Sequence, residues 1–378
     1  MTVLHLISLK GMGGRAATAM RQARLLAIRG HTVIVGCLPG TWAEQRAKEL
    51  GLVAEAGFQF RRGFRPAAFF SDCKLLADCC AKHSVNVIHA HVSQESWVAC
   101  IGARTVRPRP VLIRSRGVVV PVKPHIFNRC MHNRLTHRVV TPSRIIFDAL
   151  SNLPGFNPDR VCLIPDGVDL ARFSPSVDGS AIRQEFKIEE SAPLAVMVAR
   201  LEHVKGHEVF FGALTRLARD VPGLRAICAC DERTPGAFDA TVRKAREMGL
   251  APELLSFTGM RPDIERIYAA ADVVALPSLG SEGSSRVALE AAASAVPVVA
   301  SSVGCLPEVI EDQKTGRLVP PGNPDALAAA LLPLLKNRDQ AKLLGRAARE
   351  RAEKLYDERQ MVEKLEQVYT EELSKRAL

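Results

Sequence analysis

Short apolar runs of strand length alternate with segments of helical periodicity along most of the chain. The first run, Thr2–Leu9, is followed by the glycine turn Gly11–Gly14 and then by residues 15–29, where Ala19 and Ala23 recur at helical spacing. Strands of a parallel sheet are continuous apolar runs because helices bury both faces of the sheet. The alternation therefore predicts an α/β fold with helices on both faces of a parallel sheet.

Two such series follow each other along the chain. Strands of the first series are predicted at Thr2–Leu9, Thr32–Cys37, Val85–Ile88, Val111–Ile113, Arg138–Val140 and Arg160–Ile164. Strands of the second series are predicted at Leu194–Val198, Arg225–Cys228, Leu255–Thr258, Val273–Leu276 and Val298–Ala300. The linker-like stretch 173–180 separates the series. We therefore expect two Rossmann-like, doubly wound domains, at residues 1–175 and 176–355.

The end of the chain is predicted to be helical from about Pro324, with a break near Tyr356–Asp357. Met361, Leu365 and Val368 give the last helix an apolar face. Because such a face needs a partner, we expect residues 356–378 to pack back on the first domain.

The amino-acid composition supports two folded domains and excludes some classes of protein. The chain has 378 residues, of which 47% are apolar and 24% charged, which fits two folded domains and excludes a disordered chain. No apolar run approaches the roughly 18 residues that a membrane-spanning helix needs, and no signal peptide is recognisable. We expect a cytoplasmic protein.

The ten cysteines lie mostly in or beside apolar runs. None forms a Cys-x-x-Cys pair, and the spacing of Cys228 and Cys230 is wrong for a zinc knuckle. They are predicted to be small core residues in a reducing compartment, with disulfides and metal sites as less favoured alternatives.

Positive charge is concentrated in the first half of the chain. Residues 1–180 carry 24 Lys and Arg against 11 Asp and Glu, or +13, while the remainder carries 27 against 29, or −2. A one-sided basic field favours an anionic partner, such as a phosphorylated glycan, an anionic lipid surface or a nucleic acid. The basic and aromatic stretch 58–65, with Phe69 and Phe70, suggests either a core edge or a patch that docks on a membrane or an acceptor.

Residues 271–310 carry the most informative pattern. A buried strand, Val273–Leu276, ends in Pro277, and a loop with Glu282 and Gly283 leads into a helix predicted from about Ser284. A helix N-terminus at the carboxyl edge of a parallel sheet favours a diphosphate. Glu282 and Glu290 would be about 12 Å apart at helical rise, too far for a glycosidase pair but suited to two ends of one long ligand.

This segment resembles the Glu-x7-Glu signature of the family-4 retaining glycosyltransferases, also called glycosyl transferases group 1, which have the GT-B fold. The resemblance extends over the chain through further motifs: Gly13-Gly14, His89-Ala-His91, Pro165-Asp-Gly-Val-Asp169, Ala199 to Gly206, Phe257-Thr-Gly259 with Asp263 and Tyr268, and Gly304 to Glu308. The resemblance implies two Rossmann-like domains that face a central cleft.

The resemblance also implies roles for individual residues. Arg200 and Lys205 would hold the diphosphate of a nucleotide-sugar donor, where negative charge grows as the glycosidic bond breaks. Glu282 would bind the sugar, Glu290 the ribose, and His91 would lie opposite the sugar. The implied catalytic residues are Glu282, His91, Arg200 and Lys205. The implied donor-binding residues are Gly13, Gly14, Arg200, Lys205, Glu282, Gly283, Ser284, Ser285 and Glu290. Attack from the front face would retain the anomeric configuration, with no metal and no other cofactor.

Some positions depart from the family pattern. Ser284-Ser285 stand where Phe-Gly is usual, and Asp166 replaces an asparagine. The strand near residue 228 ends without the usual glycine-rich turn, so the preferred nucleotide base is left open. Arg114 and Arg116 stand where a histidine turn is frequent, and we expect them to bind an anionic acceptor.

Other interpretations remain open at this stage. The two glutamates could compensate a helix dipole or lie on a solvated face, Arg200 and Lys205 could be surface charges, and His91 could be a core histidine. A nicotinamide dehydrogenase is disfavoured because no acidic residue follows the second strand. A nucleotide-sugar epimerase or phosphorylase would share the fold, and charge alone supports a non-catalytic module that binds nucleic acid.

The interpretation favoured by the sequence is a transferase of hexosyl type. It would pass a sugar to an anionic glycan or lipid-linked acceptor in cell-envelope polysaccharide or lipopolysaccharide synthesis. Peripheral contact with the inner face of the membrane through the basic N-terminal domain is part of this hypothesis, and nucleic acid is not an expected partner.

Overall fold

The computed structural model describes residues 1–11, 13–61, 63, 65–232, 234–280 and 282–376. The chain divides into two compact units. Unit 1 comprises Met1–Asp166 and Arg359–Leu378, and unit 2 comprises Gly167–Glu358. The division falls after Asp166, ahead of the boundary expected after residue 175, because residues 167–175 pack with unit 2: Val168 and Phe173 belong to its core.

The described part of unit 1 contains a seven-stranded parallel sheet, in the order β3-β2-β1-β4-β5-β6-β7. The strands are β1 Thr2–Ile7, β2 Thr32–Cys37, β3 Val53–Glu55, β4 Val87–Ala90, β5 Val111–Ser115, β6 Arg138–Thr141 and β7 Val161–Leu163. The chain starts in the middle of the sheet and reverses its direction of growth after β3. Ligands of open α/β sheets bind at such a reversal, outside the carboxyl ends of the strands.

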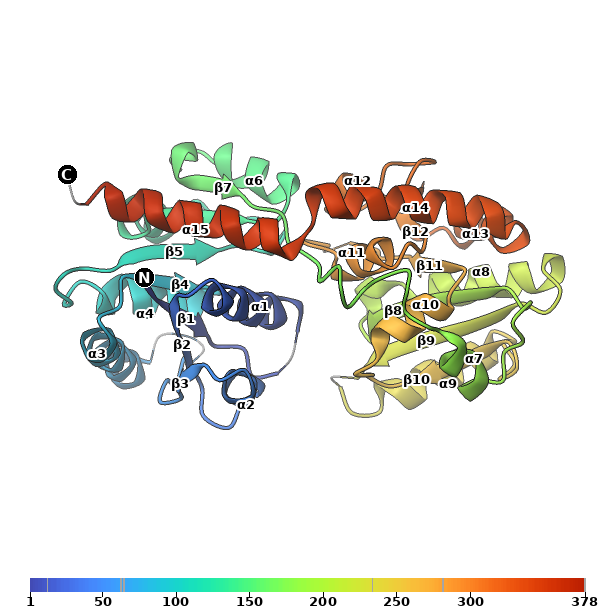
Figure 1. Ribbon diagram of the computed structural model, residues 1–378, viewed down its shortest axis with the longest axis horizontal. Helices are drawn as coiled ribbons and strands as arrows, with labels where there is room; N and C mark the ends of the chain where they lie inside the picture. The colour runs from blue at the N-terminus through green and yellow to red at the C-terminus, as the bar shows by residue number, and fades with distance from the viewer. Residues whose placement is uncertain (12, 62, 64, 233, 281, 377–378) are drawn as a thin grey trace. The chain divides into compact units, whose positions relative to one another are not determined.

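Helices cover this sheet on both faces, as the apolar runs predicted. They are α1 Gly14–Ile28, α2 Trp42–Glu49, α3 Pro66–His83, α4 Ser93–Gly102, α5 Ile126–Cys130, α6 Arg144–Ser151 and α15 Glu358–Ser374. The last helix, α15, is drawn in red beside the sheet in Figure 1. Its Met361, Leu365 and Tyr369 are buried in one core with Val3 of β1 and Ile113 of β5. The final helix thus completes the core of unit 1.

Unit 2 repeats the architecture. Its described residues form a six-stranded sheet in the order β10-β9-β8-β11-β12-β13, with every pairing parallel. The strands are β8 Leu194–Arg200, β9 Arg225–Asp231, β10 Leu255–Thr258, β11 Val273–Leu276, β12 Val298–Ser301 and β13 Gly316–Val319. The reversal in this sheet lies between β8 and β11.

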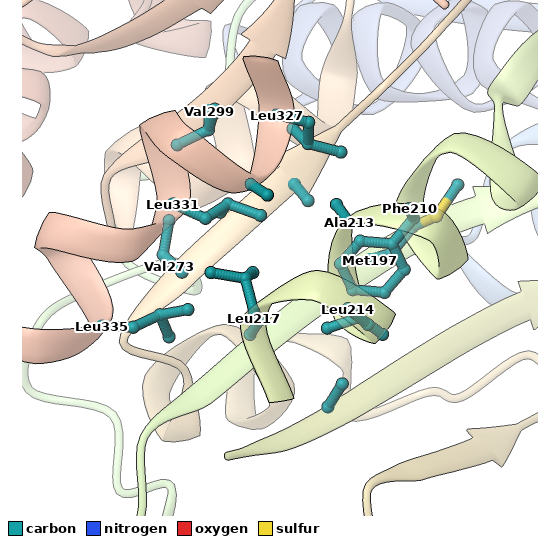
Figure 2. Close-up of a cluster of buried hydrophobic side chains, with 14 of the residues drawn as sticks. Met197, Phe210, Ala213, Leu214, Leu217, Val273, Val299, Leu327, Leu331 and Leu335 are labelled. Atoms are coloured by element: carbon teal, nitrogen blue, oxygen red, sulfur yellow. The ribbon is translucent and has the colours of Figure 1, made fainter. Parts of the chain in front are cut away.

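The helices of unit 2 are α7 Ser180–Glu185, α8 His207–Asp220, α9 Ala237–Glu247, α10 Ile264–Ala270, α11 Arg286–Ala293, α12 Leu306–Val309, α13 Pro324–Lys336 and α14 Arg338–Leu355. Figure 2 shows how one face is closed: Leu331 of α13 and Leu217 of α8 meet over Val273 of β11. Burial of such side chains contributes about 1.5–3 kcal/mol each. This packing fixes α8 and β11 relative to each other within unit 2.

Two short strands, β3 and β13, were not predicted. Both are edge strands of their sheets, and each includes a charged residue, Glu55 or Arg317. The charged residue interrupts a run of only three or four residues, so no continuous apolar signal is left. The other two edge strands, β7 and β10, contain no charged residue and were predicted. None of the helices in the described residues is both long enough and apolar enough to cross a bilayer.

Candidate functional site

Three neighbouring strands of unit 2, β8, β11 and β12, end at one edge of the sheet, and the loops that follow them are bonded to each other. Leu279 N donates to Val204 O at 2.8 Å, which joins the β11 loop to the β8 loop. Cys305 N donates to Glu282 O at 2.9 Å, which joins the β12 loop to the β11 loop. The loops therefore form one connected surface where the sequence predicts a diphosphate.

Two glycines let these loops approach closely. Gly206 has φ +73°, and a Cβ placed there would lie 2.0 Å from Pro277 O. Gly304 has φ +55°, and a Cβ placed there would lie 2.1 Å from Glu282 O. Any side chain at either position would push the β11 loop away, so the backbone position of Glu282 depends on Gly304.

Replacement of Gly304 by alanine is expected to lower the free energy of unfolding by about 2–4 kcal/mol, because a backbone clash is added to left-handed strain. Urea denaturation measures the loss. Gly223→Ala is the matched control, because Gly223 has φ +70° but no atom within 4 Å of the added Cβ. Equal losses of unfolding free energy in the two variants would show that the β11 loop moves away from the added Cβ with no loss of stability.

Lys205 and Glu282 form a buried ion pair at the centre of this surface. Lys205 Nζ lies 2.5 Å from Glu282 Oε1, and the Ser278 hydroxyl donates to the same oxygen at 2.6 Å. The Lys205 and Glu282 side chains are 16% and 11% exposed, so water screens the pair weakly. Two residues to which the family resemblance gave neighbouring parts of one ligand, 77 positions apart, are thus in contact.

Arg200 is the last residue of β8, on the same edge of the sheet. Its guanidinium donates to the Glu202 carboxylate, and both side chains are more than a third exposed. An exposed ion pair of this kind contributes little to stability and can be exchanged for another anion at small cost. The guanidinium of Arg200 can therefore bind a phosphate after leaving Glu202, at a smaller cost in free energy than a buried, paired arginine would have.

Glu290 lies on α11 and is buried by different neighbours. Its Oε2 accepts a hydrogen bond from the Tyr268 hydroxyl at 3.0 Å, and its Oε1 accepts one from Arg286 at 2.8 Å. Burial, followed by the charge of Glu290, raises the pKa of Tyr268 well above its ordinary value. The Glu282 and Glu290 carboxylates thus have separate sets of partners, as two ends of a long ligand would require.

The predicted helix start at Ser284 was two residues early. Helix α11 begins at Arg286, and Ser285 precedes it in a left-handed conformation with φ +38°. A non-glycine residue in this conformation carries strain, which the surrounding structure must maintain. Gly283, Ser284 and Ser285 therefore form a tight loop before the helix, and Ser285 is buried.

In unit 1 the predicted residues also follow adjacent strands, β1, β4 and β5. Gly13 and Gly14 lie at the start of α1, where Gly13 O accepts the first helical hydrogen bond, and His91 directly follows β4. His91 Nε2 lies 2.9 Å from Nδ1 of His5, and both rings are buried. Burial lowers the pKa of His5 to about 3 and lowers that of His91 well below its ordinary value. His91 is therefore neutral at pH 7.

The buried carboxylate of Glu95 holds the backbone around His91. It accepts hydrogen bonds from the backbone N–H groups of Ser8, His91 and Val92, at 2.7, 2.7 and 2.8 Å. Burial raises its pKa to about 7, despite the three donors. Glu95 thus joins the end of β1 to the end of β4, and it was not predicted from the sequence.

The two arginines that were predicted to bind an acceptor differ in their surroundings. Arg114 is buried, its Nη2 lies 3.3 Å from Ser93 Oγ, and its Nε has no hydrogen-bond partner among the described residues. Burial and the charge of Arg116 lower its pKa to about 10. Arg116 is partly exposed, and after burial the charge of Arg15 is what lowers its pKa. Arg15 is exposed and Arg116 is partly exposed, so both are more accessible than the buried Arg114.

The basic and aromatic stretch 58–65 is only partly an exposed patch. Phe58 and Phe60 stack at 4.9 Å and are buried in the core of unit 1, while Phe70 is 60% exposed. Residues 62 and 64 lie outside the described residues. The two buried phenylalanines favour the core-edge interpretation for this part of the stretch.

Several residues that support the site were missed. No role was predicted for Ser278, Arg15 or Glu95. Ser278 is only four positions from its partner Glu282, whereas Arg15 acts on Arg116 and Glu95 accepts from Ser8, both far along the chain. The sequence holds only half of a local signal for Glu95: it has the position of a capping-box glutamate in the first turn of α4, but the N-cap residue is Val92 and not Ser or Thr.

Comparison with known proteins agrees with this geometry. Residues 192–337 match the family model of glycosyl transferases group 1, and residues 12–172 match that of glycosyltransferase family 4. A D-inositol 3-phosphate glycosyltransferase of Segniliparus rotundus is 31% identical over 212 residues, which cover 56% of this chain and 47% of the relative. The match therefore spans about half the length of that curated relative.

Solved structures resemble the whole chain. A glycosyltransferase from Rickettsia africae superposes with a TM-score of 0.89 at 21% identity, over 98% of each chain. Anabaena Alr3699/HepE, in complex with UDP, superposes with a TM-score of 0.82 at 21% identity, over 98% of this chain and 100% of that one. These likenesses confirm the predicted fold of two parallel-sheet α/β domains. With a family model matching each half, the chain belongs to the family-4, group 1 glycosyltransferases of GT-B fold.

Proposed function

We propose that this chain transfers a sugar from a nucleotide-sugar donor to an anionic glycan or lipid-linked acceptor, with retention of configuration. The observation that carries the proposal is the contact of Lys205 with Glu282 at the joined ends of β8 and β11. An ammonium group and a carboxylate held side by side suit a donor that has a diphosphate next to sugar hydroxyls.

The donor is proposed to lie along α11. Its diphosphate would accept from Lys205 and Arg200 and from the loop Gly283–Ser285 at the helix start. Glu282 would accept from sugar hydroxyls, and Glu290 from the ribose. The positive charges would stabilise the diphosphate as it leaves, which makes a metal ion unnecessary for this step. The bound UDP of the Anabaena structure supports a uridine nucleotide as the first ligand to test.

The acceptor is proposed to carry a phosphate. The relatives named D-inositol 3-phosphate glycosyltransferase support this class, and so does the accessible pair of cations, Arg15 and Arg116. The neutral His91 would lie near the reacting sugar, with the leaving phosphate assisting removal of the acceptor proton. Synthesis of a cell-envelope glycan at the inner face of a membrane remains the proposed setting.

Thermal melting with a panel of nucleoside diphosphates and nucleotide sugars tests the donor site. One nucleotide is expected to raise the midpoint, since a ligand that binds only the folded state adds about 2.7 kcal/mol at a hundredfold excess over its dissociation constant. The shift should vanish in Glu290→Ala and persist in Glu350→Ala, which changes an exposed glutamate of α14. If no nucleotide shifts the wild type, the proposal fails and a non-catalytic module takes its place.

Retention is tested on the product. Nuclear magnetic resonance of the anomeric proton should show the configuration of the donor. An inverted product would contradict front-face attack, and an isomerised nucleotide sugar without transfer would indicate an epimerase.

A further inference from the structure

Three side chains that can bind a metal ion converge inside unit 2, apart from the residues assigned to the donor. They are His207, the first residue of α8, and Cys228 and Cys230 of β9. One ligand atom of each lies within 4.8 Å of the other two, and the sulfur atoms are 3.3 Å apart. All three residues are buried.

The sequence brings them together through strand geometry. Cys228 and Cys230 are two positions apart on β9, so both side chains point to one face of the sheet, and both belong to the core that α8 covers. His207 enters from the start of α8. Its Nε2 is buried and has no hydrogen-bond partner in the described part of the chain. An unsatisfied buried nitrogen costs about 1–3 kcal/mol unless a further ligand is present.

We propose that His207, Cys228 and Cys230 form a binding site for a thiophilic divalent cation, with Zn²⁺ as the ion that the ligand types favour. Two thiolates and one imidazole are ligands that zinc binds tightly, and calcium and magnesium prefer oxygen. Zn–S bonds of about 2.3 Å in a tetrahedron place two sulfurs roughly 3.8 Å apart. The present sulfur separation of 3.3 Å needs only a small opening to reach that value.

Binding would exchange protons for the cation. Without the metal the two sulfur atoms lie within hydrogen-bond distance of each other. Zn²⁺ would replace the protons of both thiols, release them to solvent and take an electron pair from each sulfur and from one nitrogen of His207. Three protein ligands leave the fourth position of the ion to water.

Two other clusters of potential ligands in the described residues fit a metal less well. In the cluster His5, His89 and His91, both nitrogens of His89 are already bonded, to Tyr369 and to Ser115. In the cluster Glu55, Cys79 and His83, the carboxylate of Glu55 already accepts from Lys82 and His83. Neither combines two thiols with an unpartnered imidazole nitrogen.

The site would act on the loop that precedes it. His207 directly follows Lys205 and Gly206, so a cation that fixes His207 would also fix the start of α8 beneath the β8 loop. The inference does not depend on the proposed transfer reaction, because metal binding can be measured with no nucleotide sugar present.

The test uses the full chain, freed of metal with a chelator and then titrated with Zn²⁺ against a chromophoric chelator, and separately with Co²⁺. We expect one Zn²⁺ per chain, with submicromolar affinity, and a cobalt complex that absorbs in the near ultraviolet through thiolate charge transfer. The double variant Cys228→Ala/Cys230→Ala should lose both signals. The double variant Cys37→Ala/Cys100→Ala, which changes two buried cysteines of unit 1, should keep them.

A wild-type chain that binds no stoichiometric Zn²⁺, or binding that survives in Cys228→Ala/Cys230→Ala, would overturn the proposal. If that variant does not fold, the proposal is judged by the Zn²⁺ stoichiometry and the alkylation of the wild-type chain. Zn²⁺ should slow alkylation of Cys228 and Cys230, measured peptide by peptide by mass spectrometry, and should leave Cys37 and Cys100 unchanged. Equal alkylation with and without Zn²⁺ would contradict a site at these thiols.

Discussion

Replacement of Lys205 by methionine is expected to lower kcat/KM for sugar transfer roughly 10²–10³-fold, the usual effect of removing one fixed group that stabilises charge in a transition state. Methionine keeps the length and apolar stem of the side chain but removes its charge. The rate of nucleoside diphosphate release from the nucleotide sugar identified by melting measures the loss.

The same change should destabilise unit 2, because the Glu282 carboxylate would stay buried without its cation. Loss of one partner of a buried pair costs about 3–5 kcal/mol. The double variant Lys205→Met/Glu282→Gln should recover most of the stability, since no charge is left unpaired, but none of the activity. Recovery of both would show that Lys205 only neutralises Glu282.

Lys314→Met is the control for the loss of a lysine charge as such. Lys314 forms an ion pair with Glu311 at 2.8 Å, and these side chains are 73% and 36% exposed. Water already solvates both charges, so neither activity nor stability should change appreciably. A comparable loss of activity in this variant would point to net charge, rather than to the Lys205–Glu282 contact.

Acidification from pH 7 to pH 5 is expected to unfold unit 1 before unit 2. Burial is the largest cause that lowers the pKa of five histidines, all in unit 1: His5, His89, His91, His132 and His137. Burial lowers the pKa of His132 to about 3 and that of His137 to about 4. These imidazoles stay neutral in the folded chain and become protonated on unfolding.

The direction in which stability changes with pH follows from the difference in bound protons between the folded and unfolded states. A histidine whose folded pKa is lowered contributes stability that is complete above about pH 6.5 and is lost as the pH falls toward its folded pKa. Glu95 acts in the opposite direction, because its raised pKa of about 7 makes the folded state bind a proton between pH 7 and about 4.5. Five imidazoles against one carboxyl leave a net uptake of about four protons on unfolding. The free energy of unfolding should therefore fall by several kcal/mol per pH unit near pH 5.

Tryptophan fluorescence isolates this effect, because the two tryptophans, Trp42 and Trp97, both lie in unit 1. Urea transitions followed by fluorescence should move to lower urea between pH 7 and pH 5, and should separate from transitions followed by circular dichroism, which reports both units.

The variant His132→Leu should reduce the pH dependence of the unfolding free energy by about 1.4 kcal/mol per pH unit. His125→Asn, at an exposed position that keeps an N-capping side chain, should not. Transitions that coincide at both pH values would contradict the expectation.

The central strands and the two-domain plan were predictable because they depend on local apolar runs. β1, β2 and β11 lie within one or two residues of the predicted ranges, since a strand buried on both faces leaves a continuous signal. β3 and β13 escaped because a charged residue, Glu55 or Arg317, interrupts each short run, whereas the edge strands β7 and β10 contain no charged residue and were predicted. The division into compact units after Asp166 depends on long-range packing of Phe173, which no local pattern reveals.

The residues of the candidate site also fall into two groups, those that a motif predicts and those whose role appears only in the folded structure. Lys205 and Glu282 were predicted by motif resemblance, and the structure places them in contact. Ser278 was missed although Glu282 is only four positions away, because no motif marks a serine that donates to a carboxylate at that spacing, and Arg15 was missed because Arg116 lies far along the chain. Arg114 was predicted to face a ligand, but its position in β5 turns it toward Ser93 and away from solvent. Alternation along a strand cannot separate Arg114 from Arg116, because residues two positions apart share a face. Arg114 lies within β5 and is buried, whereas Arg116 follows the end of the strand and is partly exposed.

Helix α15 has a consequence for synthesis on the ribosome. Residues 167–358 of unit 2 are made after β7 and before Met361, Leu365 and Tyr369, the α15 residues that belong to the core of unit 1. At roughly 5–20 residues per second, the central part of the protein can fold before the terminal part is complete. Until α15 is made, the apolar face of the first sheet that this helix covers stays uncovered. We expect a chaperone to bind the nascent chain during that interval.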